Sequence, residues 1–247
     1  NYLWQSDIKY GLYVNGKPTY MVCFLDDCTR FVLHSEFYET IDQKIVQDCF
    51  RKALVKYGAP DSVYFDNGKQ YRTHFMHRAC GKLGIRLLFA KPYSPEGKGK
   101  QERYNQTVDS FLREAKLAKP KDLDGLNRLY QVWMEECYLH KVHSALNGKS
   151  PYETYQADPH ELRMLPAEEI ADAFLSCEKR KVDKSGCISF MGEKYEVEMG
   201  LHMIHRDVDV IYDAADISKV TIECEGIGTC SAVPLAIQSH AGARPAL

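Results

Sequence analysis

Residues 62–68 read SVYFDNG, a short apolar run that ends in Asp66 and is followed by the turn pair Asn67-Gly68. Apolar β-formers bounded by turn residues are typical of a buried strand, so Asp66 is predicted at the carboxyl end of one. A turn directly behind the acid is compatible with two roles. The acid can be a structural turn residue, or its carboxylate can be directed outward toward a ligand.

The sequence on either side of this strand alternates between strand and helix patterns. Three runs before residue 40 have strand character, and Asn15-Gly16 is a hairpin-turn signal between the first two. Helical spacing then precedes the acid, and a helix, a strand and two helices follow it. The expected elements are strands 2–14, 19–25, 31–37, 62–65 and 85–90 and helices 41–57, 73–83, 101–116 and 123–140. This order predicts an α/β fold with a mixed five-stranded sheet flanked by helices.

Two further acids occupy positions from which they can converge on Asp66. Asp7 lies within the first predicted strand, and Glu102 lies in the first turn of a long helix, after the 35 residues from 67 to 101. Three carboxylates are hard oxygen ligands that suit Mg²⁺ or Mn²⁺. Two such ions can clamp the attacking and leaving oxygens of a phosphodiester. The alternative for Glu102 is a helix-dipole role.

The sequence changes character after residue 177. Short β-patterned runs separated by glycine turns, such as 187–190 and 208–212, predict a small all-β barrel. Prolines punctuate the connection before it. The expected domains are an α/β core over 1–155, a linker over 156–176, the barrel over 177–225 and a flexible tail over 226–247.

Composition narrows the class of protein. With 45% hydrophobic residues the chain can bury a sizeable core, and no apolar run approaches the ~20 residues of a membrane span. Nine cysteines without a C-x-x-C pair indicate a reduced cytoplasmic compartment rather than a disulfide framework or a zinc site. Because the chain begins at Asn1 and enters a strand almost at once, we expect a further segment upstream.

These motifs together resemble the DDE superfamily of retroviral-integrase-like transposases, and in particular the catalytic domains of bacterial insertion-sequence transposases. The matching text is WQSDIKYG at 4–11, DDCTR at 26–30, FDNG at 65–68, YSPEGKGKQER at 93–103, HSAL at 143–146 and SPY at 150–152. The likeness covers about 2–155. Residues 178–212 are similar to the small β-barrel that follows the catalytic domain in phage Mu-type transposases.

The resemblance implies an RNase H-like fold with Asp7, Asp66 and Glu102 as catalytic residues that bind two Mg²⁺ or Mn²⁺ ions. It implies metal-dependent cleavage and strand transfer of DNA, with transposon ends and target DNA as partners. It also implies a homo-multimer on DNA, no membrane, and a bacterial cytoplasmic location at the nucleoid. Two alternatives stay open: an RNase H-type nuclease, and a non-catalytic DNA-binding subunit of transposition.

The net charge of −2 does not indicate a nucleic-acid partner, but the sequence around Glu102 is locally basic. We expect DNA contacts from residues in this stretch and from the turn after Asp66, namely Lys91, Tyr93, Lys98, Lys100, Arg103 and Asn67. A solvated helix face is the alternative.

The sequence departs in two respects from the pattern of the resembling proteins. Lys9 stands where the superfamily often has Thr, and Gln106 and Asp109 stand where retroviral integrases carry lysines. The roles of those lysines therefore do not transfer. Asp26 and Asp27, at the end of the second strand, are interpreted as turn acids that pair with Arg30 rather than as metal ligands.

Overall fold

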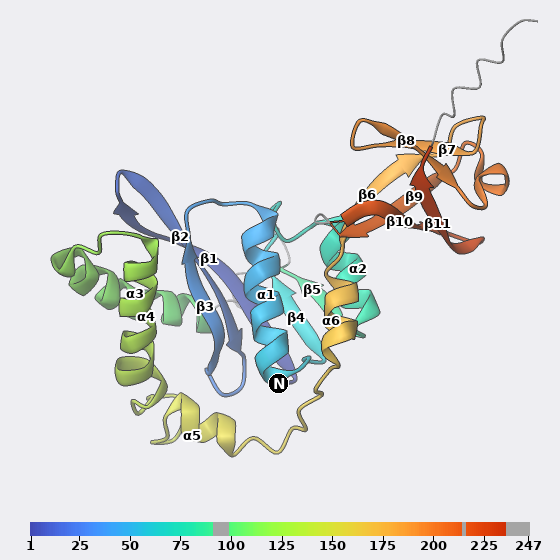
Figure 1. The fold of residues 1–247 in the computed structure, drawn as a ribbon. Coiled ribbons are helices and arrows are strands. Elements are labelled where there is room, and N and C mark those ends of the chain that lie inside the picture. Colours follow the sequence, from blue (N-terminus) through green and yellow to red (C-terminus); the bar gives the residue numbers. More distant parts are fainter. Residues whose placement is uncertain (91–98, 214–215, 236–247) are drawn as a thin grey trace, which may run out of the picture. The chain divides into compact units, whose positions relative to one another are not determined.

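The computed structural model describes residues 1–90, 99–213 and 216–235 and divides the chain into two compact units, Asn1–Phe174 and Leu175–Leu247. Each unit encloses a hydrophobic core of its own. The first unit holds the α/β part of the chain and the second is built from strands (Figure 1).

The first unit is organised around a mixed five-stranded sheet with the order β3-β2-β1-β4-β5. Its strands are β1 (Leu3–Val14), β2 (Lys17–Asp26), β3 (Val32–Tyr38), β4 (Ser62–Phe65) and β5 (Arg86–Phe89). The first three form an antiparallel meander, while β4 pairs in parallel with β1 and β5 pairs in parallel with β4. The predicted mixed five-stranded sheet is therefore confirmed.

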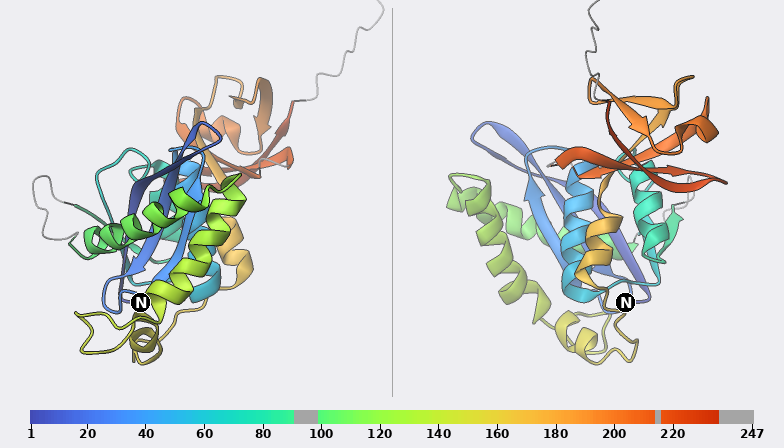
Figure 2. Two further views of the ribbon diagram at one scale, coloured as in Figure 1. Left: turned by 90° about the vertical axis from the view of Figure 1, so that its left-hand side faces the viewer. Right: turned by 45° about the vertical axis from the view of Figure 1, so that its right-hand side comes forward.

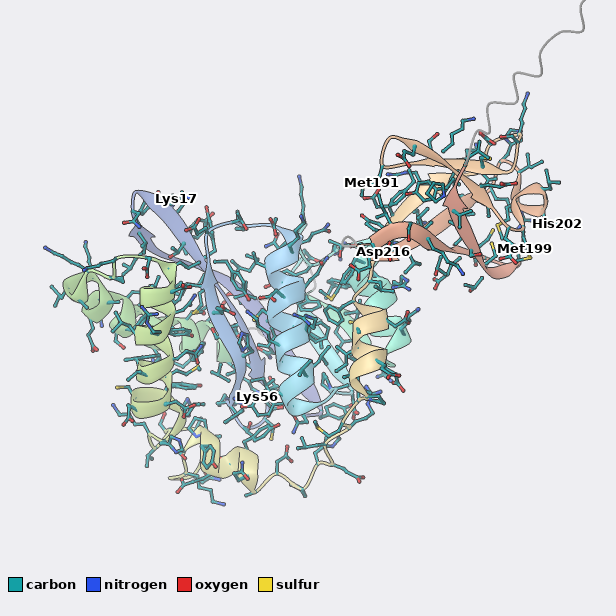
Figure 3. The ribbon with its side chains drawn as sticks, viewed as in Figure 1. Lys17, Lys56, Met191, Met199, His202 and Asp216 are labelled. Carbon is teal, nitrogen blue, oxygen red and sulfur yellow. The ribbon has the colours of Figure 1, made fainter. Side chains whose placement is uncertain are left out.

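The β1–β2 hairpin closes at the turn that the sequence predicts. Asn15 and Gly16 both have positive φ angles, 52° and 76°, as the two central residues of a type I′ hairpin turn require. Lys17 then begins β2 at the hairpin tip (Figure 3). The register slips between Tyr10 and Tyr13, so a β-bulge separates the hairpin end of β1 from the part that carries Asp7.

Helices cover both faces of the sheet (Figure 2). They are α1 (Gln43–Tyr57), α2 (His74–Lys82), α3 (Gly99–Ala118), α4 (Leu123–Met134), α5 (Pro151–Gln156) and α6 (Ala167–Ala173). On one face Phe50 of α1 packs on Phe24 and Trp4, with ring centroids 5.0 and 6.4 Å apart. On the other face Phe37 of β3 packs on Phe111 of α3 and on α4.

The predicted helix over 123–140 is two elements. A π-helix, Glu135–Leu139, follows α4 directly and buries Tyr138. The Tyr138 hydroxyl donates to the carbonyl of Arg30 at 2.8 Å. Helical spacing in a sequence does not distinguish an α-turn from a π-turn, because the wider turn changes the apolar pattern by only one residue.

Residues 156–176 contain a packed helix, which the linker prediction for this segment missed. Ile170 and Ala173 of α6 are buried in the core of the first unit, and Lys82 forms an ion pair with Asp172 at 2.7 Å. Arg163 also donates to the Leu83 carbonyl at 2.7 Å. Pro159 follows α5 and Pro166 is the N-cap of α6, so the prolines lie outside the helices without detaching the segment from the core.

The second unit is a six-stranded antiparallel sheet, with the order β6-β9-β10-β11-β8-β7, that curls into a nearly closed barrel. Its strands are β6 (Ser176–Lys181), β7 (Cys187–Phe190), β8 (Glu193–Val197), β9 (Asp207–Asp213), β10 (Asp216–Cys224) and β11 (Gly228–Pro234), and a 3₁₀ helix, Gly200–Met203, lies between β8 and β9. Arg180 of β6 donates to the Ser189 carbonyl of β7 at 3.1 Å, which joins the two end strands.

The barrel extends further along the chain than the sequence predicts. Residues 226–247 were expected to form a flexible tail, but β11 lies between β10 and β8 and pairs with both. β11 begins at Gly228 and ends at Pro234, two residue types that weaken the local β signal, so its pairing partners define it. Residues 236–247 of the expected tail lie outside the described residues. Among the described helices, none is long and apolar enough to cross a membrane.

We predict that Phe50→Ala destabilises the first unit by about 3–5 kcal/mol, because it removes a fully buried ring from the contact between α1 and the sheet. Both tryptophans of the chain, Trp4 and Trp133, lie in this unit, so their fluorescence during urea denaturation measures its unfolding. As a control, Tyr13→Ala removes an aromatic ring that is 76% exposed and should change stability by less than about 0.5 kcal/mol. Equal midpoints for the two variants would contradict this account of the core.

Candidate active site

The parallel pairing of β1 with β4 brings Asp7 beside Asp66. Gln5 and Tyr64 form the last pair of this ladder, and two residues further along each chain segment come Asp7, within β1, and Asp66, just after the end of β4. Tyr71 lies close to both acids. Burial raises the pKa of its hydroxyl well above the usual range, and the negative charges of Asp7 and Asp66 raise it further.

The turn after Asp66 orients its carboxylate. The backbone N–H of Gly68 donates to Asp66 Oδ1 at 2.7 Å. A Cβ at position 68 would lie 2.7 Å from that same oxygen, which explains why glycine is needed there. Asn67 donates to the Ala90 carbonyl at 2.7 Å and so ties the end of β4 to the end of β5. The turn role and the outward-directed role of Asp66 are thus compatible.

Helix α3 carries Glu102 to the same region. Asn105, one turn further along α3, donates to Asp7 Oδ2 at 2.8 Å. Residues three apart on a helix have Cβ atoms ~5–6 Å from each other, so Glu102 lies on the part of α3 that faces Asp7. The Gln101 side chain contacts the thiol of Cys23, which is the cross-strand partner of Asp7. The first turns of α3 therefore lie over the two strand-borne acids.

The three carboxylates share a region without touching one another. Within the described part of the chain, their oxygens do not all lie within 4.8 Å of each other. Asp7 and Asp66 are half-buried, whereas Glu102 is exposed in the first turn of α3. Bringing all three to one ion therefore requires a rotation of the Glu102 side chain.

The two departures noted in the sequence are partners in space. Lys9 of β1 forms an ion pair with Asp109 of α3 at 2.8 Å, and the lysine is 18% exposed. This pair lies beyond the Asn105–Asp7 hydrogen bond on the same two elements. It adds a second connection between α3 and the strand that carries Asp7.

Lys100, predicted to contact DNA, forms an ion pair with Asp27. Gln5 donates to the same carboxylate at 2.6 Å. The expected pairing of Asp27 with Arg30 is wrong, because the Arg30 guanidinium donates to the backbone carbonyls of Asp27 and Cys28 instead. Asp26 is a buried turn acid, as predicted, and accepts from the Thr29 N–H at 2.9 Å.

The remaining predicted DNA contacts divide into two groups. Arg103 is exposed on α3 and contacts Gln106 at 3.3 Å. Lys91, Tyr93 and Lys98 lie outside the described residues. The structure adds residues that the sequence did not single out, chiefly Asn105 and Tyr71. Helical spacing from Glu102 is a signal that could have found Asn105, whereas nothing local marks Tyr71.

Comparison with known proteins identifies both units. Residues 1–95 match the family model of the integrase core domain, and residues 171–225 match that of the Mu transposase C-terminal domain. Residues 1–95 are thus similar to an integrase core, and residues 171–225 are similar to a Mu-type transposase C-terminal domain.

Two relatives are similar over part of their length. The transposase for transposon Tn552 of Staphylococcus aureus is 25% identical over 187 residues, which is 71% of this chain and 38% of the relative. The Pol-related polyprotein of the mouse intracisternal A-particle is 26% identical over 114 residues, which is 46% of this chain and 13% of the polyprotein. The chain thus spans less than half of either relative.

Two solved structures share the fold. One is the simian T-cell lymphotropic virus intasome in complex with the PP2A regulatory subunit B56 gamma, which is 15% identical with a TM-score of 0.55. The match covers 95% of this chain and 76% of the chain in that structure. The HTLV-2 integrase catalytic core domain in complex with magnesium, in its trimeric form, is 19% identical with a TM-score of 0.50. It covers 62% of this chain and 95% of its own.

We predict that Gly68→Ala displaces the Asp66 carboxylate and weakens Mn²⁺ binding at this site by roughly tenfold, since the groups that orient a ligand contribute on this scale. Calorimetric titration measures the affinity. The matched control is Gly81→Ala in α2, where a Cβ meets nothing within 4 Å. Equal Mn²⁺ affinities for the two variants would show that the turn does not position Asp66.

Proposed function

We propose that this chain is a DDE-type polynucleotidyl transferase that cleaves DNA at the ends of a mobile element and joins those ends to target DNA. One observation carries the proposal: β1 and β4 run parallel from the Gln5–Tyr64 pair toward Asp7 and Asp66, while Asn105 of the Glu102-bearing helix donates to Asp7. The matches to the integrase core domain and to the Tn552 transposase support this class of reaction.

The donor set fits a divalent metal of the hard type. Asp7, Asp66 and Glu102 offer carboxylate oxygens, which Mg²⁺ and Mn²⁺ prefer. Among the described residues, Asn105 Oδ1 is buried and has no hydrogen-bond partner, so a further oxygen lies beside Asp7. We propose that these acids hold two Mg²⁺ or Mn²⁺ ions. When bound, the ions would activate the attacking oxygen and stabilise the leaving 3′-oxygen of an in-line displacement.

The residues around the acids have positioning roles. The Gly68 N–H donates to Asp66 and the Asn105 amide donates to Asp7, so each bond orients one of the two carboxylates. The buried Tyr71 ring stacks on Phe65 with centroids 4.7 Å apart, so the floor beneath the two strand-borne acids is apolar and packed. A floor of this kind holds the acids in place and excludes water from below.

DNA is the proposed substrate, with transposon ends and target DNA both bound and with several copies of the chain assembled on them. The relative from Staphylococcus aureus is a transposase, and one structural neighbour is an intasome. We propose that the enzyme acts at the bacterial nucleoid. Arg103, Asn67 and the locally basic segment with Lys91, Tyr93, Lys98 and Lys100 are the proposed DNA contacts.

We predict that Asp66→Asn abolishes DNA cleavage and strand transfer and leaves the unfolding midpoint in metal-free buffer unchanged. The amide keeps the shape of the side chain but loses its negative charge. As a control, Asp61→Asn makes the same change at an exposed residue directly before the start of β4, and this variant should retain activity. Full strand transfer by Asp66→Asn would overturn the assignment. Preferential cutting of an RNA–DNA hybrid over end-bearing duplex DNA by the wild type would favour an RNase H-type nuclease.

Metal binding separates an enzyme from a non-catalytic DNA-binding subunit. We predict that Mn²⁺ at about a hundred times its dissociation constant raises the free energy of unfolding of the first unit by about 2.7 kcal/mol. Tryptophan fluorescence in urea measures the change, and Asp7→Asn should remove most of it. If calorimetry detects no binding of millimolar Mn²⁺ or Mg²⁺ to the wild type, the non-catalytic alternative is correct.

A further inference from the structure

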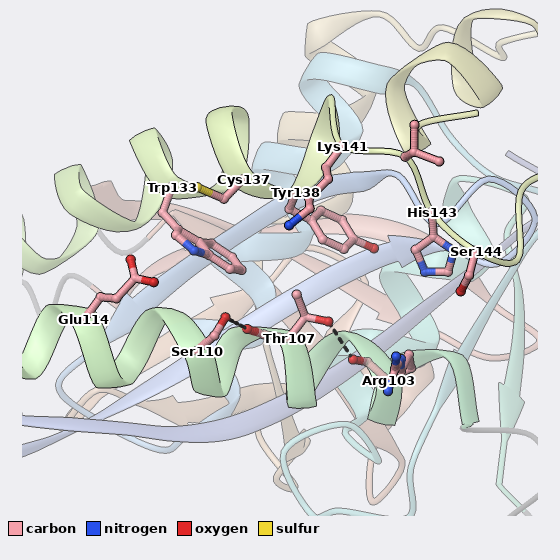
Figure 4. A pocket seen from close by; sticks show the side chains of 11 residues that line it. Arg103, Thr107, Ser110, Glu114, Trp133, Cys137, Tyr138, Lys141, His143 and Ser144 are labelled. Atoms are coloured by element: carbon pink, nitrogen blue, oxygen red, sulfur yellow. Dashed lines mark hydrogen bonds between the residues drawn. The ribbon is translucent and has the colours of Figure 1, made fainter. Parts of the chain in front are cut away.

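A groove of about 560 Å³ runs along α3, between this helix and the segment that contains the π-helix and the following residues (Figure 4). Arg103 lies at one end of it and Glu114 at the other, eleven residues along α3, which corresponds to about 16 Å at 1.5 Å per residue. Because Arg103 follows Glu102 directly in α3, this end of the groove lies next to one of the three proposed metal ligands.

Positive charge is concentrated at the end of the groove near the active site. Arg103 of α3 and Lys141 and His143 of the opposite wall line it there, and Arg30 lies close enough to affect the charge state of His143. The acid in the lining, Glu114, is at the far end. This polarity contrasts with the net charge of −2 for the whole chain.

His143 is held as a hydrogen-bond donor toward the groove. The backbone N–H of Ala145 donates to His143 Nδ1 at 3.2 Å, so the proton of the neutral ring is on Nε2. Burial lowers the pKa of His143, and the positive charges of Arg30 and Arg103 lower it further. Figure 4 shows the His143 ring across the groove from Arg103.

The other polar groups of the groove have different partners. Thr107 donates to the Arg103 carbonyl at 3.0 Å and Ser110 donates to the Thr107 carbonyl at 2.6 Å, so both hydroxyl protons are directed at α3 itself. Arg103, Lys141 and His143 offer a ligand a guanidinium, an ammonium and an imidazole N–H. These are the groups that recognise a phosphodiester.

Contacts within the protein hold the wall that carries Lys141 and His143 in place without a ligand. The buried Tyr138 bonds to the Arg30 carbonyl and packs on Tyr104 with ring centroids 4.8 Å apart. The backbone N–H of His143 donates to the Lys149 carbonyl at 3.0 Å. The π-helix thus anchors the start of this wall, as π-turns often do at functional sites.

We propose that this groove binds the sugar–phosphate backbone of one DNA strand that runs from the active site, with Arg103, Lys141 and His143 as donors to successive phosphates. This inference rests on the proposed function, because it states where the DNA substrate of the proposed enzyme lies on the protein. It adds contacts from the segment after α4, which lies about 40 residues beyond Glu102 in the sequence.

The test is DNA binding by the double variant Lys141→Gln/His143→Gln, measured with a fluorescent oligonucleotide in metal-free buffer. We expect roughly a tenfold loss of affinity, as for a lost charge-assisted hydrogen bond, and a salt slope smaller by about 1. Lys149→Gln makes the same charge change in the same segment outside the groove and should bind like the wild type. Equal affinities and slopes for the double variant and the wild type would overturn the proposal.

Cys137 provides an independent test, because this thiol is exposed and lines the groove. An oligonucleotide whose backbone tether ends in an activated disulfide should exchange with the Cys137 thiol, forming a mixed disulfide and releasing the leaving thiol, and the yield should fall in Lys141→Gln/His143→Gln. Cys28, also exposed but outside the groove, is the control for general thiol reactivity. Cleavage assays with Mn²⁺ run in parallel. If cross-linking is unchanged in the double variant while the wild type cleaves DNA, the proposed DNA path through the groove is refuted and the proposed function stands. If the wild type neither binds nor cleaves DNA, the proposed function itself is refuted.

Discussion

The parallel pairing of β1 with β4 is the constraint on which the candidate site depends. Parallel neighbours require a crossover connection, and here β2, β3 and α1 lie between them in the chain. Burial of Phe50 of α1 against Phe24 and Trp4 holds that crossover on the sheet. As a result two acids far apart in the sequence reach the same edge, and Tyr71 lies beneath both of them.

Ion pairs connect α3 to this edge and change the interpretation of the basic residues. Lys9 pairs with Asp109, and Lys100 pairs with Asp27, so both lysines hold the helix and the strands together. An ion pair of this kind contributes little to overall stability when it is exposed, but it restricts how the helix sits on the sheet. Along the groove, the donors directed outward are instead the positively charged Arg103 and Lys141 and the imidazole of His143.

The strands, the hairpin turn and the helices of the first unit could be predicted because their signals are local. The positive φ angles of Asn15 and Gly16, and the apolar spacing of α1, follow from the residues themselves. Two elements could not be predicted in this way. Helix α6 and strand β11 depend on partners far away in the sequence, and prolines or glycines obscure their local patterns.

For the candidate site, sequence motifs predict Asp7, Asp66 and Glu102, because each acid stands in a local context that marks it. The motifs do not predict how the surrounding residues are arranged. The register of β1 against β4, the hydrogen bond from Asn105 to Asp7 and the pairing of Lys100 with Asp27 join residues on separate elements. Local propensity acts over a few neighbouring residues, whereas these contacts form only when packing of the core brings distant segments together.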